Sequence, residues 1–199
     1  MASPDPLQAP TLAALPRAQI GTLGSLLPKP SPSLRVSIVE PLRVLSLRCL
    51  PGGAPAIAAA LGVAEIPGPG RFHGEDPLLQ WRSPNEWLHI GTRDEPADAV
   101  LRALPIGMGH AQATDLSAGT IVFELQGPSL DALLQRLLDA TVQVGQPGQG
   151  TRTRLADIAV VAMRLSEQRL WLLADRANDH YLAHWLAYAN VSASASTSS

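Results

Sequence analysis

One order of predicted elements occurs twice in this 199-residue chain, and that repeat limits the possible folds more than any other feature. The first copy runs through a strand, a short helix, a hairpin and a second helix, at Leu42–Leu50, Ala54–Leu61, Leu78–Arg82 with Glu86–Ile90, and Asp94–Leu104. Leu42–Leu50 alternates apolar and polar residues, which is the period of a half-buried strand. Pro84 favours the hairpin turn because its ring pre-sets the backbone there, and Gly62 is a typical helix end.

The second copy starts about 77 residues later with the same order of elements. Its strands and helices are predicted at Thr120–Leu125, Pro128–Leu138, Thr153–Leu155, Ala159–Leu165, Leu170–Ala174 and about Ala177–Tyr188. Trp87 in the first hairpin and Trp171 in the second occupy corresponding places. This order predicts an α+β fold: a duplicated split β-α-β unit, with helices on one face of antiparallel or mixed sheets.

The ends of the chain differ from this central domain. Residues 1–33 hold seven of the 18 prolines and form a predicted extended arm. Residues 34–189 form the α+β domain, with halves at about 34–110 and 111–189, and the Ser/Ala-rich residues 190–199 form a predicted flexible tail. The arm carries many leucines for a solvated segment, so it either lies across another protein or packs on its own domain.

Charge and cysteine content exclude several classes of protein. A net charge of −2 argues against nucleic-acid binding, which needs a clustered excess of Lys and Arg. Cys49 is the single cysteine, which excludes an internal disulfide and a multi-cysteine metal site. The start of the chain lacks a basic region before an apolar run, and no apolar stretch reaches about 18 residues. We therefore expect no signal peptide, no membrane span and a cytoplasmic location.

Motifs for the common cofactor sites are missing. The glycine-rich runs at 68–70, 107–109 and 145–150 do not open a helix, as a dinucleotide-binding loop must. The single lysine, Lys29, lies in the arm, which excludes a phosphate-loop lysine and a Schiff-base lysine in a packed pocket.

Metal chemistry has only a partial set of side chains. His180 and His184 lie four apart on the predicted final helix, and Asp175 or Asp179 could add a further ligand. Two histidines are too few for a closed zinc site, and the glutamate of the zincin motif is missing beside the first histidine.

Nucleophiles are equally isolated. Cys49 lies in an alternating strand, where a buried and inert thiol is the ordinary outcome. Ser117 and Ser129 stand near Asp115 and Asp131, but no nucleophile elbow surrounds them, and Ser129 is typical of a helix start. We predict no catalytic, cofactor-binding or metal-binding residue in this chain.

Aromatic and arginine side chains are the candidates for a partner surface, since Trp and Arg are enriched at binding hot spots. These candidates are Trp81, Trp87, Trp171, Trp185, Tyr181, Tyr188, Arg152, Arg154, Arg164 and Arg169.

Several passages resemble one known family and occur in the right order. Asp115–Ala140 reads DLSAGTIVFELQGPSLDALLQRLLDA, Thr151–Ala189 reads TRTRLADIAVVAMRLSEQRLWLLADRANDHYLAHWLAYA, and Pro84–Ile90 reads PNEWLHI. Over about Leu42–Ala189 the chain resembles the gamma subunit of heterotetrameric sarcosine oxidase. It also resembles, more loosely, the folate-binding domain of the aminomethyltransferase of glycine cleavage.

The resemblance implies a non-catalytic structural subunit of a bacterial flavin-dependent oxidase that demethylates sarcosine or a related secondary amino acid. It implies alpha, beta and delta subunits as partners, with alpha packing directly against this chain. FAD, FMN, NAD, tetrahydrofolate and zinc are then held by other subunits, and this chain holds none of them.

The alternative is a stand-alone folate-binding one-carbon protein, because the wider superfamily binds folate. Such a site needs a carboxylate for the pterin ring and apolar walls around it. Glu40, Asp115 and Glu124 have the right side-chain type, but nothing in the sequence places them together.

Overall fold

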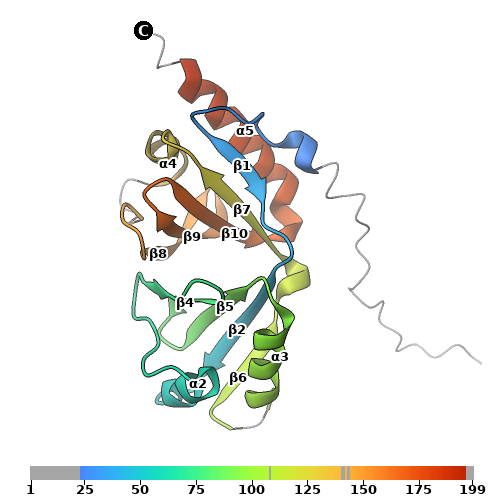
Figure 1. Ribbon diagram of the computed structural model, residues 1–199, viewed down its shortest axis with the longest axis vertical. Helices are drawn as coiled ribbons and strands as arrows, with labels where there is room; N and C mark the ends of the chain where they lie inside the picture. The colour runs from blue at the N-terminus through green and yellow to red at the C-terminus, as the bar shows by residue number, and fades with distance from the viewer. Residues whose placement is uncertain (1–22, 108, 140–141, 143, 196–199) are drawn as a thin grey trace, which may run out of the picture.

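The computed structural model describes residues 23–107, 109–139, 142 and 144–195, with side chains described as far as residue 190. These residues form a mixed α+β fold with two five-stranded sheets, which Figure 1 shows one above the other. Every strand pair between the named strands is antiparallel. The antiparallel form of the predicted α+β class is therefore the one observed.

The first sheet has the strand order β3-β4-β5-β2-β6. Its strands are β3 (Phe72–His73), β4 (Leu78–Ser83), β5 (Glu86–Gly91), β2 (Arg43–Cys49) and β6 (Ala111–Asp115), and its helices are α2 (Ala54–Leu61) and α3 (Asp94–Ala103). Gly62 ends α2 in a left-handed conformation, with φ of 66°, as the sequence predicts. Two acidic residues open α3, where they complement the helix dipole.

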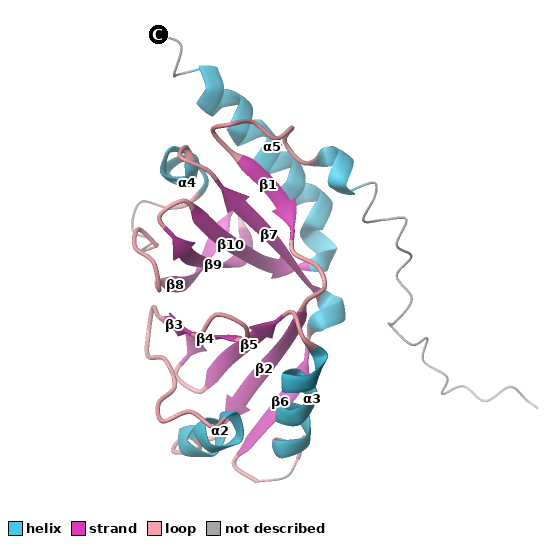
Figure 2. Ribbon diagram, viewed as in Figure 1, coloured by secondary structure: helices cyan, strands magenta, loops and turns pink. Residues whose placement is uncertain are grey.

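The second sheet has the strand order β1-β7-β10-β9-β8. Its strands are β1 (Arg35–Ile38), β7 (Thr120–Gln126), β10 (Arg169–Asp175), β9 (Ile158–Ser166) and β8 (Gly150–Leu155), and its helices are α4 (Leu130–Leu137) and α5 (Asp179–Ala195). Two 3-10 turns, Ser117–Gly119 and Arg176–Asn178, lead into β7 and α5. Figure 2 shows these strands grouped apart from those of the first sheet.

Each sheet takes its last strand from the other half of the sequence. β1 pairs with β7 of the second sheet, where Val36 lies opposite Leu125. β6 pairs with β2 of the first sheet, where Ala113 lies opposite Leu47. The two orders then agree strand for strand, with β6 in one sheet at the position of β1 in the other.

Three apolar clusters fix the layers. The largest lies between the second sheet and α4 and α5, and includes Phe123, Leu133 and Leu186. A second fills the space between the inner faces of the two sheets, and a third lies between the first sheet and α2 and α3, around Leu47 and Ile57. The helices therefore cover the outer face of each sheet, and the inner faces pack on each other.

The part of the predicted arm that is described lies on its own domain. A helical turn at 23–26 buries Leu23 in the cluster under α4 and α5, and Leu26 and Leu27 pack against that cluster. Residues 1–22 lie outside the described residues.

Trp87 and Trp171, predicted to occupy corresponding places, lie on opposite faces of their sheets. Trp87 is opposite Leu47 and packs in the outer cluster of the first sheet, whereas Trp171 is opposite Glu124 and packs between the sheets. Successive side chains of a strand alternate between its two faces. The two tryptophans are therefore one residue out of register, and Leu170, opposite Leu125, takes the place of Trp87.

Candidate functional site

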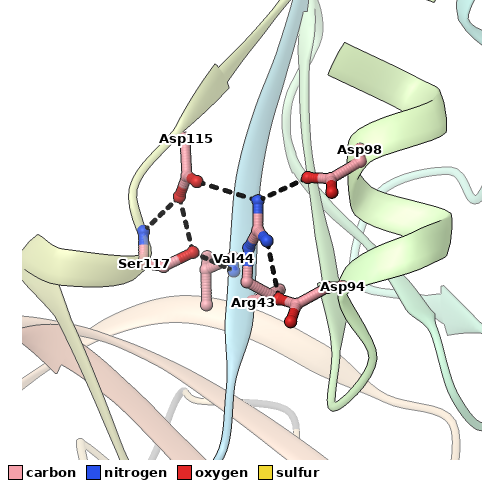
Figure 3. A network of polar contacts seen from close by, with 6 residues as sticks. All are labelled: Arg43, Val44, Asp94, Asp98, Asp115 and Ser117. Carbon is pink, nitrogen blue, oxygen red and sulfur yellow. Dashed lines mark hydrogen bonds and ion pairs between the residues drawn. The ribbon is translucent and has the colours of Figure 1, made fainter. Parts of the chain in front are cut away.

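An arginine at the start of β2 joins three elements of the first sheet (Figure 3). Arg43 Nη1 donates to Asp94 Oδ1 at 2.7 Å, and Nη2 lies 3.1 Å from both Asp98 Oδ1 and Asp115 Oδ2. Asp94 and Asp98 lie one turn apart on α3, and Asp115 ends β6. The guanidinium therefore ties β2 both to the outer helix and to the edge strand.

These contacts shift the pKa of the charged groups. The hydrogen bond to Asp94 raises the pKa of Arg43 above its usual value, although partial burial opposes the shift. Burial raises the pKa of Asp115, but hydrogen bonds from Ser117 and the charge of Arg43 outweigh it, so the pKa is lowered. Ser117 Oγ donates to Asp115 Oδ1 at 2.5 Å and accepts the Val44 N–H at 3.0 Å. One guanidinium shared by three carboxylates joins a strand, a helix and an edge strand, which is a structural role.

A second polar cluster lies on the inner face of the same sheet. Glu86 is 8% exposed, and its Oε1 accepts hydrogen bonds from Ser46 Oγ at 2.7 Å and Arg82 Nη1 at 2.9 Å. Arg48 Nε lies 3.3 Å from the same oxygen. One oxygen of this carboxylate therefore carries three contacts, which tie β5 to β2 and β4.

A cavity of about 560 Å³ opens where the inner faces of the two sheets separate. Its apolar walls include Val44 and Leu88 from the first sheet and Val161 and Leu173 from the second. Its charged lining residues are Arg82, Asp115, Arg152 and Asp175. The cavity could admit a small planar molecule, but a pterin needs a carboxylate with a free edge.

The structure does not bring the three candidate pterin carboxylates together. Asp115 lines the inter-sheet cavity, where the arginine cluster described above engages it. Glu40 lines a different cavity, of about 390 Å³. Glu124 accepts the Trp171 indole N–H at 2.8 Å and a hydrogen bond from Arg169 Nε at 2.6 Å. The three candidates therefore do not form one folate site.

The two candidate metal-ligating histidines lie on the exposed side of α5. His180 Nδ1 lies 2.6 Å from Asp179 Oδ1, and His184 is exposed one turn further on. Asp175 instead accepts the Ala177 N–H at the start of a 3-10 turn. Across the described ranges, no three His, Cys, Asp or Glu side chains gather where they could hold a metal ion.

Two further candidate nucleophiles, Cys49 and Ser129, have local structural roles. Cys49 packs against the outer cluster of the first sheet, and burial raises the pKa of its thiol, although a hydrogen bond from Gly53 opposes this. Ser129 directly precedes α4, as predicted, but its side chain makes no capping hydrogen bond. Its backbone N–H donates to the Ser33 carbonyl at 3.0 Å and so ties α4 to the N-terminal segment.

Three of the candidates for a partner surface are core residues, and that assignment is wrong for them. Trp87 and Trp171 are 4% and 6% exposed, because their large rings fill the two clusters named above. Trp87 Nε1 donates to the Pro67 carbonyl at 2.8 Å. Arg164 is fully buried, with Nη1 2.8 Å from Asp131 Oδ1.

Of the seven remaining candidates, Trp81 is half-buried against the outer cluster of the first sheet, Arg169 is paired with Glu124, and the other five form two exposed areas. Tyr181, Trp185 and Tyr188 follow the outer face of α5 at helical spacing, and the last two rings meet edge to face with centroids 5.9 Å apart. Arg152 and Arg154 are exposed on β8, at an edge of the second sheet.

Comparison with known proteins first defines the class of fold. The chain superposes on aminomethyltransferase T of the glycine cleavage system from Bartonella henselae with a TM-score of 0.60. That match covers 84% of this chain and 48% of the other at 15% identity, so it shows a shared aminomethyltransferase-like fold. No family model matches the chain.

Closer matches define the family. A chain of heterotetrameric sarcosine oxidase from Corynebacterium sp. U-96 superposes with a TM-score of 0.76 and 26% identity, over 89% of this chain and 93% of that one. The sarcosine oxidase gamma subunit of Corynebacterium sp. strain U-96 is 33% identical over 151 residues, which is 71% of this chain and 72% of the relative. The gamma subunit from Arthrobacter sp. is 31% identical over 148 residues. The chain belongs to the family of sarcosine oxidase gamma subunits.

Proposed function

We propose that this chain is a non-catalytic structural subunit of a heterotetrameric, flavin-dependent oxidase of the sarcosine oxidase type. The observation that carries the proposal is the superposition on a chain of heterotetrameric sarcosine oxidase over 93% of that chain's length. Such a complex oxidises sarcosine or a related secondary amino acid at its CH–NH bond. The product is an imine, from which the one-carbon unit is released.

The chemistry of this reaction belongs to companion subunits. FAD, FMN, NAD, tetrahydrofolate and zinc are held there, and this chain supplies no catalytic, cofactor-binding or metal-binding residue. The engagement of Asp115, Glu86 and Glu124 by arginine side chains supports this division, because these contacts give the three carboxylates a structural role.

Alpha, beta and delta chains are the partners in this proposal, and alpha is the direct neighbour. In this proposal the arm predicted at residues 1–33 contributes to the contact. Helix α5 continues to Ala195, beyond the predicted start of the tail at residue 190, and residues 196–199 lie outside the described residues. We place this complex in the cytoplasm. Among the described residues, no helix has both the length and the apolar character of a membrane span.

The domain itself is a duplicated split β-α-β unit. The matching strand orders of the two sheets support this proposal, and so does the order of strand, helix, hairpin and helix within each. The exchange of β1 and β6 argues against a simple division of the two units at residue 110.

The second candidate function is a stand-alone folate-binding one-carbon protein. The inter-sheet cavity of about 560 Å³ is the observation in its favour. The engaged carboxylates count against it.

Expression of the chain alone and together with the subunits encoded beside it separates the two candidates. The subunit proposal expects the chain to co-elute with a yellow, flavin-loaded partner on size exclusion. It also expects that deletion of residues 1–22, which leaves the buried Leu23 in place, weakens assembly without loss of partner flavin. A chain that stays monomeric beside its companions, and whose melting temperature rises with tetrahydrofolate, would overturn the proposal. Saturation at one hundred times Kd would then add about 2.7 kcal/mol of stability.

A further inference from the structure

β8 is an edge strand whose outer side is only partly covered. It pairs with β9 along its whole length, from Gly150 opposite Met163 to Leu155 opposite Ile158. On the other side, the described residues pair with this edge only where the strand begins. Arg71 forms an antiparallel bridge with Gln149, and Gly150 N–H donates to the Gly70 carbonyl at 3.0 Å. The rest of this edge is already an extended strand, which is the geometry that pairing with a further strand requires.

The bonds of Gly150 show which backbone groups face this open side. Its N–H binds Gly70, and its carbonyl accepts Gln80 Nε2 at 3.0 Å, so both groups point away from β9. Backbone direction alternates along a strand. The N–H and C=O groups of Arg152 and Arg154 therefore face outward, and those of Thr151 and Thr153 face β9. Within the described part of the chain, no backbone partner covers the outward groups of these two arginines.

Arginine side chains gather along the same edge. A cavity of about 690 Å³ runs beside β8, and its lining includes Arg71, Arg152, Arg154 and Asp139. None of the three arginines forms an ion pair or side-chain hydrogen bond to another described residue. By contrast, Arg43, Arg82, Arg164 and Arg169 are all paired. The cavity is therefore lined by three arginines that have no ion-pair partner among the described residues, and by one carboxylate.

The spacing of these charges matches an extended peptide. Arg152 and Arg154 are two residues apart, so their side chains lie on the same face of β8, about 7 Å apart along the strand. A strand laid antiparallel or parallel to β8 presents its own alternate side chains at the same interval. Carboxylates at those alternate positions would meet the guanidinium groups, which favour carboxylate partners.

We propose that β8 binds an extended acidic segment of a partner protein as a sixth strand of the second sheet. Backbone bonds to Arg152 and Arg154 align the segment, and Arg71, Arg152 and Arg154 select acidic side chains at alternate positions. The inference deepens the proposed function by defining a surface that a companion subunit engages, and it rests on that function only for the identity of the partner.

The direct test uses synthetic peptides and the full chain. The probe is an eight-residue peptide of alternating Thr and Glu, and its control has Lys in place of Glu. Amide NMR spectra are expected to show shifts and slower hydrogen exchange at Arg152 and Arg154 with the acidic peptide alone. Absence of binding, or binding that leaves these two amides exchanging freely, would overturn the proposal.

Two matched variants separate the backbone from the charge. Arg152→Pro and Arg152→Ala both remove the guanidinium, but only the proline removes an outward N–H, and it leaves the β9 ladder intact. We expect the proline variant to bind the acidic peptide several-fold more weakly than the alanine variant, with a similar melting temperature. Equal binding by the two variants would contradict strand pairing.

Assembly with the companion subunits gives an independent readout. Arg152→Glu with Arg154→Glu is expected to weaken assembly about tenfold or more, because the reversed charges repel an acidic segment. The control, Arg35→Glu with Arg102→Glu, changes two exposed arginines away from β8 and should assemble normally. Failed assembly of the unmodified chain, with peptide binding retained, would contradict the proposed function and support the strand pairing. Normal assembly with unprotected amides at Arg152 and Arg154 would support the proposed function and contradict the strand pairing.

Discussion

The two sheets share one strand order but place different side chains at matching positions. Aligned by their strand partners, Leu45 opposite His89 in the first sheet matches Phe123 opposite Leu172 in the second. The outer cluster of the second sheet gathers leucines from α4 and α5, whereas that of the first sheet is smaller and includes alanines of α3 and β6. We therefore expect the stability of the second sheet to depend more on apolar burial, and that of the first sheet more on polar contacts.

Both inner faces carry a polar pair at matching positions, but the carboxylate lies on a different strand in each. In the first sheet, Ser46 on β2 binds Glu86 on β5. At the matching place in the second sheet, the carboxylate is Glu124 on β7 and its partner is Arg169 on β10. The first version is more deeply buried, since the Glu86 side chain is 11% exposed and that of Glu124 is 17% exposed.

The largest expected effect comes from core truncation at the matched pair of apolar positions. Phe123→Ala removes a ring with no exposed surface and should lower the free energy of unfolding by about 3–5 kcal/mol. Leu45→Ala should cost less, about 2–3 kcal/mol, because its side chain is smaller and its cluster has fewer large neighbours. Urea denaturation of both variants measures the difference. A larger loss for Leu45→Ala would contradict the expected order of the two apolar clusters.

Removal of the two inner carboxylates should have the next largest effect. Glu86→Ala leaves the Ser46 hydroxyl and two arginines without their acceptor, at a cost of about 2–3 kcal/mol. Glu124→Ala, at the more exposed site, should cost about 1–2 kcal/mol. Thermal unfolding under one buffer tests the order, and equal losses would show that burial does not set the strength of these clusters.

Arg43 has no charged counterpart, since Ile121 occupies its matching position in the second sheet. Arg43→Met should lower the stability at neutral pH by about 1–2 kcal/mol, because the contacts are several but partly exposed. In the fold the pKa of Asp115 lies below its ordinary value of 3.8, so its ionised form stabilises the fold fully above pH 3.8. This contribution is lost as the pH falls through the lowered pKa. Denaturation curves of the variant and the unmodified chain should therefore converge in acid, and a gap independent of pH would contradict an electrostatic role.

His89 gives the smallest expected effect. It is 2% exposed, and burial lowers its pKa from the ordinary 6.5, although the charge of Asp76 opposes the shift. The folded state then binds fewer protons than the unfolded state, so stability should fall as pH decreases from 6.5 toward the lowered pKa. His89→Leu, which copies Leu172 of the second sheet, should remove this dependence and add about 1 kcal/mol at neutral pH. A retained pH slope in this variant would assign the dependence to another group.

Sequence patterns predicted local elements well and long-range pairing poorly. α2 and the first hairpin lie where they were predicted, because capping glycines, turn residues and alternation are local signals. β1 escaped prediction because its four residues become a strand only by pairing with β7. The register of Trp171 was missed for a related reason: alternation alone does not fix which face of a strand lies inward.

The polar clusters were missed in the same way. Asp94 and Asp98 share a helix face, which was a visible signal, but their partner Arg43 lies on β2 and meets them only in the folded chain. A surface position was expected for Arg164 because a charged residue is rarely buried, yet Asp131 and the Glu167 carbonyl accept from its two terminal nitrogens inside the fold.

The exchange of edge strands bears on how the protein is made. A ribosome releases β1 first, but its partner β7 does not exist until residues 120–126 have been synthesised. The first sheet is already complete in sequence once Asp115 has emerged, so it can close while β1 still waits. During synthesis β1 therefore has no pairing partner while the first sheet can already form, and it can pair only after the second half has been translated.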